Sequence, residues 1–532
     1  MITKINTIKV VGIEGVPVTC ECEISSGIGI HLIGLPDAAV KESLLRTVTA
    51  LQAYGYHIPG KKIIINLAPT DLHKTGSGYD LAIALGIIAG AQQEDLPELE
   101  QFVVLGELGL DGALRYVPGS VQAILTAKET GKKGCIVPES CLQEFAELFR
   151  DDYPVFAAAS LREVIDIIKD PDNAQTAWEK YLKKQNKELP DAQTISSWDA
   201  IKGNENAKRG LEIAAAGGHN LLLVGAPGSM KHTMARAILE ILPPLDKEEI
   251  LQKAKIYSAS GRMTPLNSGR PFRAPHYSAT MAAFFGGGCG ENIMPGEVTL
   301  ADNGILLLDE TNMLPKSIQE TMRATLEDKK ITISRLRSKI DYPADYLLVA
   351  TMNPCPCGYY GEGDRCTCTL TKRTEHLSRL QAPIYDNIAI QIWTHPVSKE
   401  TILKKTTGEP SADVAKRVLK ARAIQFKRYD GTPYKTNDEV PARLQKTYFN
   451  LDEECESFIE KIITHMGLSA RAYSRILKIA RTIADLTASE KILPCHMAEA
   501  ASYRFLDRNL FYNETQETIH LGNRSDAVRA NA

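Results

Sequence analysis

A glycine-rich stretch near the middle of the chain has the composition of a loop that binds phosphate. The segment LLLVGAPGSMKHTMA, residues 221–235, matches the pattern G-x-x-x-x-G-K-[ST] at Gly225 and Lys231, with a further glycine at Gly228. Met230 stands where the last glycine is expected, and His232 replaces the hydroxyl residue that ligates Mg²⁺. The candidate nucleotide-binding residues are Gly225, Ala226, Pro227, Gly228, Ser229, Met230, Lys231, His232 and Thr233.

Polar residues follow two later apolar runs at the point where each run ends. GILLLDE ends in Asp309 and Glu310, and YLLVATMNP places Asn353 just after its apolar part. A buried strand tolerates adjacent carboxylates only where they emerge into a site, and open parallel sheets bind ligands at the carboxyl ends of their strands. In a nucleotide hydrolase the Asp holds Mg²⁺ and the Glu polarises the attacking water. The alternative interpretation of Asp309 and Glu310 is an ordinary exposed strand end.

Length, composition and charge set the broad class. A chain of 532 residues predicts about three domains, and its 44% hydrophobic and 24% charged residues are ordinary for a soluble globular protein. The net charge of −3 creates no global positive field, so nucleic-acid binding would need local patches. No apolar run approaches the ~20 residues that span a bilayer, and the N-terminal segment lacks a secretory apolar region. We expect a cytoplasmic location without a membrane partner.

The hydrophobic periodicity predicts an α/β multidomain protein. Residues 62–69 and 102–110 are typical of strands, and residues 37–55 and 79–91 are typical of helices. Apolar strands at 220–225, 304–310 and 346–354, separated by helical patterns, predict adjacent strands of a parallel sheet. The expected boundaries are an α/β domain at 1–168, a linker at 169–197, a nucleotide-binding core at 198–395, a helical domain at 396–510 and a flexible tail at 511–532.

Several longer strings resemble those of a known family. The chain is similar to the Mg-chelatase-like AAA+ ATPases of the YifB or ComM family in GLPDAAVKES, INLAPTDLHKTGSGYDLAIALGI, PFRAPHYSAT, GEVTLADNGILLLDE, NPCPCGYYG and LSARAYSRILKIARTIADL. The resemblance implies a Lon-protease-like (ribosomal S5 domain 2-like) N-terminal domain, an AAA+ P-loop NTPase module and a C-terminal helical lid. It also implies a hexameric ring and, in the best-known branch, ATP-driven branch migration on DNA during natural transformation, a helicase-like role.

The resemblance also assigns roles to individual residues. Lys231 would contact the β- and γ-phosphates of ATP, and Asp309 and Glu310 would be the Mg²⁺ and water carboxylates. Asn353 would be the first sensor, and Arg471 would be the second-sensor arginine of the lid, touching the γ-phosphate. The alternative for Arg471 is a solvated helix arginine.

Three departures from the family pattern predict slow or absent hydrolysis with retained fold and weakened nucleotide binding. Met230 removes a glycine from the loop, and the imidazole of His232 is a poor ligand for Mg²⁺. PIYDNIAIQI places Asn387 where the family has an arginine finger, a residue worth ~10³–10⁵ in rate. Thr233 comes one residue too late to replace the missing hydroxyl.

Four cysteines lie close together just after Asn353. CPCGYYGEGDRCTC places Cys355, Cys357, Cys366 and Cys368 as C-x-C-x8-C-x-C, a set that can surround a tetrahedral Zn²⁺. We favour a structural metal site; free thiols and a redox pair are the alternatives. The other seven of the eleven cysteines are scattered, as expected for reduced thiols.

The N-terminal domain is not expected to be a protease. Ser77 in HKTGSGYDLAIALG lies near the position of the nucleophile of Lon-type proteases, but the position of the partner lysine holds Val121. A serine–lysine dyad needs that lysine to accept the hydroxyl proton, and Lys128 lies too far along the expected helix. Ser77 is better interpreted as a turn or helix-cap residue.

Two segments are candidates for contact with single-stranded or branched DNA. ITISRLRSKIDYPADY carries Arg335, Arg337 and Lys339 on an expected basic hairpin. PFRAPHYSAT and its preceding residue combine Arg270 and Arg273 with aromatic residues, which suits backbone contact and base stacking. A solvated charged hairpin is an equally good interpretation.

Three classes of function are therefore compatible with the sequence. We favour a AAA+ ring protein that acts on DNA with attenuated ATP turnover. The second class is a non-hydrolysing scaffold or regulatory paralogue that binds nucleotide or a partner subunit. A magnesium chelatase subunit is disfavoured, because a Lon-like N-terminal domain is not a feature of that enzyme's AAA+ subunit.

Overall fold

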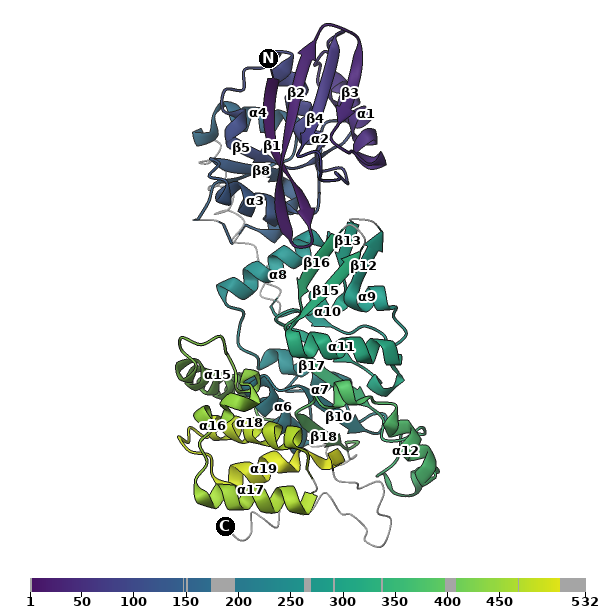
Figure 1. Ribbon diagram of the computed structural model, residues 1–532, viewed down its shortest axis with the longest axis vertical. Helices are drawn as coiled ribbons and strands as arrows, with labels where there is room; N and C mark the ends of the chain where they lie inside the picture. Colours follow the sequence, from purple (N-terminus) through teal and green to yellow (C-terminus); the bar gives the residue numbers. More distant parts are fainter. Residues whose placement is uncertain are drawn as a thin grey trace.

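The computed structural model describes three stacked parts (Figure 1). The described residues are 2–146, 148–149, 152–173, 197–262, 269–289, 292–335, 338–397, 408–466 and 468–507. The expected tail at 511–532 and most of the expected linker lie outside them. A seven-stranded sheet lies at one end of the long axis, a parallel sheet follows, and a group of helices lies at the other end. The α/β multidomain prediction is confirmed at this level.

The N-terminal part is built on a mixed sheet of order β3-β4-β2-β1-β5-β8-β9. Its strands are β1 (Ile2–Val11), β2 (Glu14–Ser25), β3 (Gly29–Ile33), β4 (Lys62–Ala68), β5 (Phe102–Val104), β8 (Gly134–Pro138) and β9 (Val155–Ala158), with a small pair β6 (Glu107–Leu108) and β7 (Leu114–Arg115). Its helices are α1 (Ala38–Ala53), α2 (Asp80–Gly90), α3 (Ser120–Glu129) and α4 (Leu161–Lys169). The predicted strand at 62–69 and the helices at 37–55 and 79–91 are confirmed, whereas the predicted strand at 102–110 is divided into β5 and β6. Asp37, whose side chain accepts from the Val40 N–H, starts α1.

The central part contains a five-stranded, all-parallel sheet of order β11-β14-β17-β10-β18. The strands are β10 (Leu221–Gly225), β11 (Phe272–Arg273), β14 (Ile305–Leu308), β17 (Leu347–Met352) and β18 (Ile390–Thr394). The helices are α6 (Glu205–Gly217), α7 (Lys231–Ala237), α8 (Lys247–Ala259), α9 (Met281–Phe285), α10 (Glu297–Leu300), α11 (Lys316–Asp328), α12 (Leu370–Ser378) and α13 (Ala382–Tyr385). The three predicted strands are confirmed as β10, β14 and β17; β18 and β11 were not predicted.

Two hairpins project from the central part toward the N-terminal part (Figure 1). They are β12 (Gly286–Cys289) with β13 (Asn292–Pro295), and β15 (Lys330–Arg335) with β16 (Ser338–Pro343). The turn between β1 and β2 meets the second hairpin, since a Cβ added to Gly12 would lie 2.7 Å from Ile340 Cγ2. Helix α3 packs on α8, where the Gln122 Nε2 donates to the Lys255 carbonyl oxygen over 2.8 Å. These contacts join the N-terminal part to the central part.

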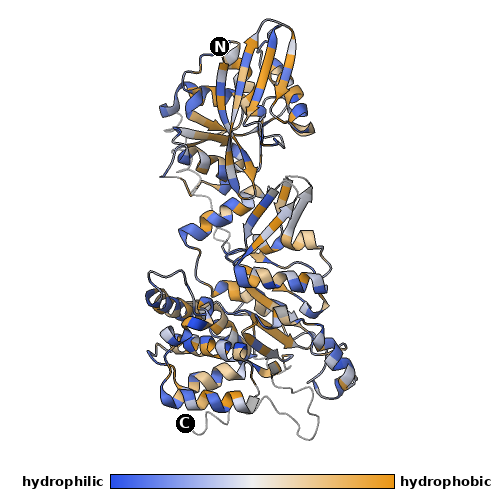
Figure 2. Ribbon diagram, in the orientation of Figure 1, coloured by the Kyte–Doolittle hydropathy of each residue, from blue (hydrophilic) through white to orange (hydrophobic). Residues whose placement is uncertain are grey.

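Side chains alternate between the two faces of the parallel sheet, as strand geometry requires. Leu221, Leu223 and Leu307 face a core shared with α6 and the C-terminal helices. Leu222 and Leu308 face a second core shared with α8, α11 and the hairpins. The strands are accordingly the most hydrophobic part of the central region, whereas exposed helices such as α15 are mainly hydrophilic (Figure 2).

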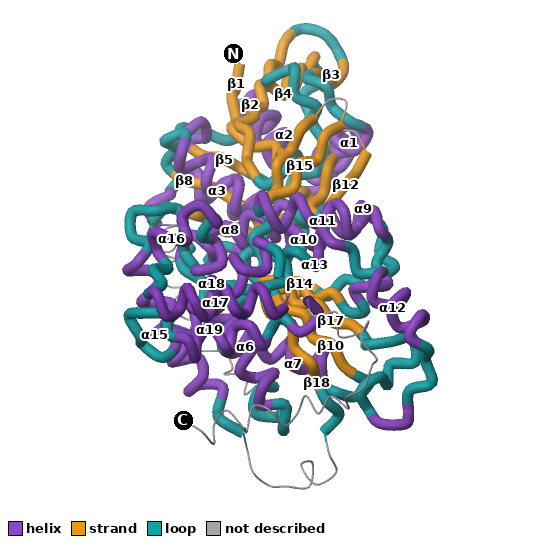
Figure 3. Tube along the Cα trace, turned by 60° about the horizontal axis from the view of Figure 1, so that its bottom comes forward, coloured by secondary structure: helices purple, strands orange, loops and turns teal. Residues whose placement is uncertain are grey.

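The C-terminal helices cover one side of the sheet. They are α15 (Ser411–Arg428), α16 (Gln445–Tyr448), α17 (Glu453–Met466), α18 (Ala470–Leu486) and α19 (Pro494–Ser502). They gather beside β10 and β18 (Figure 3), with α15 and α18 in contact with α6. The expected helical region beyond residue 396 therefore does contain helices, while its exact domain boundary stays a prediction.

Candidate functional site

The phosphate-type loop, two carboxylates and Asn353 meet at one edge of the parallel sheet. The strands β10, β14 and β17 are neighbours with parallel register, so Gly225, Leu308 and Met352 all end at the same carboxyl edge. Lys231, the first residue of α7, places its Nζ 3.3 Å from Asn353 Oδ1 and 2.6 Å from the Gly225 carbonyl oxygen. Residues 122 positions apart in sequence are thus in direct contact.

The two carboxylates complete this group. Asp309 is exposed at the end of buried β14, and its Oδ1 accepts a hydrogen bond from the hydroxyl of Thr351 on β17. Burial lowers the pKa of Lys231, and the charges of Asp309 and Glu310 oppose that shift. Glu310 has φ 48°, a left-handed conformation that costs a residue with a Cβ about 1–2 kcal/mol. Such strain persists where the surroundings impose it, and it is often found at functional sites.

The loop keeps the shape of a phosphate cradle despite its departures. Gly225 is packed against Thr394 so closely that a Cβ has no room, whereas a Cβ at Gly228, with φ 83°, would meet no atom within 4 Å. Met230 adopts φ 64°, the conformation that favours glycine, and its half-buried side chain packs against the core cluster near α7. His232 is exposed and Thr233 is half-buried. The Gly228 side of the loop is therefore open.

Arg471 lies at the opposite edge of the sheet. It is the second residue of α18, its side chain is 65% exposed, and it forms an ion pair with Asp386 at the end of α13. Asp386 precedes β18, whose first residue, Ile390, pairs with Leu221 at the amino end of β10. At about 3.3 Å per residue, a five-residue strand separates the two edges by about 13 Å. The structure does not bring Arg471 to the phosphate loop of its own chain, because α18 approaches the sheet from the amino edge.

The amino edge also holds Asn387, the residue that the resemblance places at the position of the arginine finger. Asn387 is 8% exposed, and its Oδ1 accepts a hydrogen bond from Arg475 Nη2 at 3.2 Å. Arg475 in turn donates to Asp438, which also pairs with His219 at 3.2 Å and Lys478 at 3.9 Å. Burial alone would raise the pKa of Asp438, but Lys478 and Arg475 hold it far below its usual range.

Sequence reasoning missed several residues of both edges. Thr351 and His376 at the carboxyl edge, and Asp438 and Arg475 at the amino edge, were not singled out. His376 Nε2 lies 3.0 Å from the Asn353 carbonyl oxygen and 2.9 Å from Asn312 Nδ2, and burial lowers its pKa. Arg475 and Thr351 lie inside strings that were considered for other residues, and no spacing pattern pointed to any of the four.

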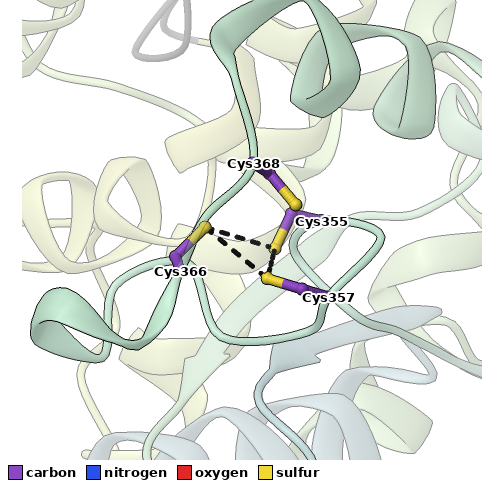
Figure 4. Close-up of side chains that lie close together, drawn as sticks. All are labelled: Cys355, Cys357, Cys366 and Cys368. Carbon is purple, nitrogen blue, oxygen red and sulfur yellow. Dashed lines mark hydrogen bonds between the residues drawn. The ribbon is translucent and has the colours of Figure 1, made fainter.

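The four cysteines of the predicted metal site converge on one another (Figure 4). Their sulfur atoms all lie within 4.8 Å of each other, and each thiol is free of a disulfide. The cluster follows β17 directly and leads into α12. This arrangement is compatible with one tetrahedral ion.

Ser77 does not contact a lysine at its hydroxyl. The Ser77 hydroxyl donates to the carboxylate of Glu107, Val121 is fully buried on α3, and Lys128 forms an ion pair with Asp152. Among the described residues, the hydrogen-bond partner of the Ser77 hydroxyl is thus a carboxylate, and the absence of protease activity stays a prediction.

The two candidate DNA-contacting segments differ in the structure. The antiparallel pairing of β15 with β16 confirms the predicted hairpin, and Lys339 is exposed on it. Arg335 ends β15, and Arg337 lies outside the described residues. Arg270 instead donates to the Pro243 and Asn303 carbonyl oxygens, and Arg273 pairs with Glu297. Both of these arginines serve intramolecular contacts, and the second segment loses its support as a DNA surface.

Comparison with known proteins finds relatives over nearly the whole chain. Family models match residues 197–402 (Magnesium chelatase, subunit ChlI), 20–141 (Subunit ChlI of Mg-chelatase) and 408–504 (Magnesium chelatase, subunit ChlI C-terminal). The protein YifB of Salmonella typhimurium is 39% identical over 96% of this chain and 98% of its own length. YifB of Escherichia coli is 38% identical over 96% and 98%, and the competence protein ComM of Haemophilus influenzae is 38% identical over 94% and 96%.

The chain belongs to the YifB/ComM family of Mg-chelatase-like proteins. The family suggests ATP and Mg²⁺ as ligands and an oligomeric state. Within the described part of the chain, no helix is long and apolar enough to cross a membrane.

The residues present fit the phosphates of ATP better than they fit Mg²⁺. The open side of Gly228 and the cationic Lys231 suit a phosphate group, which is anionic and rich in acceptors. Asp309 offers a carboxylate to the ion. His232 stands at the loop position where the pattern expects a Ser or Thr hydroxyl, and its imidazole is a poor ligand for Mg²⁺. The described residues of this loop therefore fit Mg²⁺ poorly.

Proposed function

We propose that this protein is an ATP-binding AAA+ ring protein of the YifB/ComM family that acts on DNA and hydrolyses ATP slowly. The observation that carries the proposal is the convergence of Lys231, Asp309, Glu310 and Asn353 at the carboxyl edge of the parallel sheet. These groups come from three neighbouring strands, and they form the usual phosphate and water machinery of a nucleotide hydrolase.

In this proposal each residue has a defined task. The loop of residues 225–233 surrounds the phosphates with backbone N–H groups, and Lys231 turns from the Gly225 and Ala226 carbonyl oxygens to the terminal phosphates. Glu310 orients the attacking water, and Asn353 contacts it or the γ-phosphate. ATP supplies the phosphoryl group whose transfer to water these residues assist.

Arg471 acts on a neighbouring subunit in this proposal. It lies beside Asn387, at the edge where AAA+ proteins present a finger to the next subunit, and its side chain is 65% exposed. Its charge would then reach the phosphates bound by the next chain of a hexameric ring. The N-terminal domain is proposed to be Lon-like without protease activity, and the C-terminal helices are proposed to be the lid.

Slow hydrolysis follows from the departures that the structure leaves uncorrected. His232 provides no hydroxyl, and Asn387 is buried against Arg475, where it cannot extend toward another subunit. An arginine finger is worth ~10³–10⁵ in rate, so its loss alone predicts a strongly reduced turnover. The same departures also favour a second candidate, a non-hydrolysing scaffold or regulatory paralogue.

The proposed action on DNA is supported by the relatives and by the hairpin. ComM of Haemophilus influenzae is named a competence protein. Branch migration on DNA is what the family resemblance implies. The exposed Lys330 and Lys339 of the β15–β16 hairpin are the described cations of this segment that face solvent. Single-stranded or branched DNA is the proposed partner.

Nucleotide titration with and without Mg²⁺, followed by both affinity and phosphate release, tests the ATP part. We expect measurable binding with slow release, and a turnover typical of AAA+ enzymes that is lost in Glu310→Gln would contradict slow hydrolysis. Binding of a labelled single strand at increasing salt tests the DNA part, because phosphate contacts weaken with salt. Absence of binding at low salt would leave the scaffold as the better candidate.

A further inference from the structure

The loop that carries the four cysteines is part of the wall of the phosphate site. It begins at Cys355, two residues after Asn353, and it runs to Cys368, just before α12. Asn353 also contacts Lys231, so the loop starts at the sensor side of the site. A change in the conformation of this loop can therefore shift Asn353 and Lys231, the groups that would contact a phosphate.

The sulfur geometry fits a single tetrahedral metal ion. Four thiolates at a Zn–S distance of about 2.3 Å lie about 3.8 Å from each other. The Cys355 and Cys357 sulfurs are 3.3 Å apart, and each lies 3.7 Å from the Cys366 sulfur. All four sulfurs lie within 4.8 Å, and shifts of about 1 Å or less bring them to tetrahedral spacing. A disulfide needs about 2.05 Å, so these thiols are arranged around a common centre rather than bonded in pairs.

The same loop packs on the phosphate loop and on β18. A Cβ added to Gly358, which has φ 84°, would lie 2.8 Å from Pro227 Cδ, so Gly358 is held against the phosphate loop. A Cβ added to Gly361 would lie 2.8 Å from Trp393 on β18. Arg373 of α12 lies over the ring of Tyr360 at 4.2 Å. The cysteine loop is thus packed between the phosphate loop, the last strand and α12.

We propose that Cys355, Cys357, Cys366 and Cys368 bind one Zn²⁺, and that this ion holds Gly358 against Pro227 so that zinc occupancy sets the nucleotide affinity of the phosphate loop. The effect of zinc on nucleotide affinity rests on the proposed function, whereas the existence of the metal site does not. A chain of only 14 residues whose seven central residues, GYYGEGD, are all glycine, tyrosine or acidic has little apolar surface of its own to define one conformation. The ion supplies the missing constraint.

Binding is a ligand exchange without electron transfer. Each thiol that ligates the ion forms an S–Zn bond and releases one proton to solvent, so four cysteines release up to four protons as Zn²⁺ leaves its water shell. Loading is therefore weaker at low pH, and no oxidant or reductant takes part. Soft thiolate ligands favour Zn²⁺ over Mg²⁺, which keeps this site separate from the nucleotide site.

The metal part is tested by elemental analysis of the full-length protein. We expect one zinc per chain in the wild type, none in Cys355→Ser or Cys366→Ser, and one in the control Cys495→Ser, which changes an exposed cysteine outside the cluster. Titration of Co²⁺ into chelator-treated wild-type protein, followed by absorption, gives a second measurement if the serine variants fail to fold. A wild-type protein without bound metal and without a thiolate–Co²⁺ absorption overturns the site.

The coupling to nucleotide is tested by affinity measurements on zinc-loaded and chelator-treated protein. We expect ATP to bind about tenfold more weakly without zinc, the lower end of the effect of removing a supporting group from a site. Equal affinity in the two forms overturns the coupling. One zinc per chain with no ATP binding in either form contradicts the proposed function and leaves the metal site intact.

Two glycine variants separate the contact from the metal. Gly358→Ala introduces a Cβ against Pro227, whereas Gly363→Ala introduces one in the same loop, also at positive φ (63°), where no atom lies within 4 Å. We expect both to retain one zinc and only Gly358→Ala to weaken ATP binding, by about threefold to tenfold. Equal ATP affinity in the two zinc-loaded variants overturns the role of the Pro227 contact.

Discussion

The two edges of the parallel sheet make opposite use of their charged residues. At the carboxyl edge, Lys231 and Asn353 come together from the ends of the neighbouring strands β10 and β17 with part of their surface open, so they keep the capacity to bind a ligand. At the amino edge, Asp438, Arg475 and Asn387 satisfy one another within the chain. One edge is arranged as a binding site and the other as a structural junction.

The difference has a consequence for the proposed ring. A nucleotide between two AAA+ subunits needs the carboxyl edge of one chain and a cationic group from the amino edge of the next. Here Asn387, which the resemblance places at the finger position, is buried, whereas the side chain of Arg471 is exposed. In this proposal, the carboxyl edge of one chain binds the nucleotide through its charged residues, and Arg471 of the next chain provides the cation that activates hydrolysis.

Loss of Asp438 should have the largest effect, and on stability. Asp438→Ala leaves Arg475 and Lys478 without their common carboxylate in a largely buried region, which should lower the free energy of unfolding by about 2–4 kcal/mol. Chemical denaturation measures this change. The control Asp430→Ala removes an exposed carboxylate in the turn after α15 and should stay within about 0.5 kcal/mol. Equal effects of the two variants would mean that the amino edge is not held by this network.

Loss of Lys231 should affect binding and leave the fold intact. Lys231→Ala removes a charge-assisted contact worth about 1.5–3 kcal/mol, so the affinity for ATP should fall about 10- to 100-fold. Equilibrium titration with a fluorescent ATP analogue measures it. Lys420→Ala, on the exposed surface of α15, is the matched control and should bind as the wild type does. Unchanged affinity in Lys231→Ala would remove the binding role from the carboxyl edge.

Replacing His232 should show whether the carboxyl edge lacks only a metal ligand. His232→Thr restores a hydroxyl oxygen at the exposed position beside Lys231, and we expect ATP affinity in Mg²⁺ to rise about tenfold, with little change in EDTA. His232→Ala removes the imidazole without adding an oxygen and is the control. An equal rise in both variants would show that the imidazole obstructs the site and that the missing hydroxyl is not the limiting defect.

Loss of Arg471 should separate binding from activation. Its ion pair with Asp386 is exposed, so Arg471→Ala should change the stability by less than about 1 kcal/mol and the ATP affinity by less than about twofold. Phosphate release by the assembled protein should fall further below the wild-type rate. Arg323→Ala, which breaks an exposed pair with Glu327 on α11, is the control for losing a surface arginine. A large loss of ATP affinity in Arg471→Ala would place this arginine at its own chain's nucleotide.

The smallest effect concerns the pH dependence of the amino edge. Burial lowers the pKa of His219, which faces Asp438 and Thr482, with Arg475 and Lys478 nearby. The unfolded chain, with a histidine pKa of about 6.5, therefore takes up the proton first, and stability is lost as the pH falls below about 6.5. Denaturation between about pH 7.5 and about pH 5.5 should show a shallower decline in His219→Gln than in the wild type. Parallel declines would show that another group is responsible.

The sequence predicted the elements of the carboxyl edge because their signals are local. The glycines of 225–228 and the apolar runs before Asp309 and Asn353 each lie within about ten residues, and parallel strands must end at a common edge. The amino edge was not predicted. Arg475, Asp438 and His219 are separated by 37 and 219 residues, and each of them alone resembles an ordinary polar residue.

The placement of Arg471 shows the same limit at a single residue. Its string, LSARAYSR, resembles a lid motif, and the resemblance assigned it to the phosphates of its own chain. Only the packing of α18 against α6 and α13 decides which edge of the sheet it approaches. The cysteine loop lies between these two cases. The spacing of its cysteines predicted that they cluster, but only the packing of the loop places its Gly358 against Pro227.

The sequence by itself determined the family, the alternation of strands and helices, and the residues at the strand ends, since these depend on short-range pattern and on the directions of neighbouring strands. The tertiary structure alone decided which polar residues satisfy one another and which stay open, because that depends on how helices far apart in sequence pack on the sheet. Buried charges must find partners wherever the chain provides them, and the partners of Asp438 come from the loop after α6 and from α18 through packing alone.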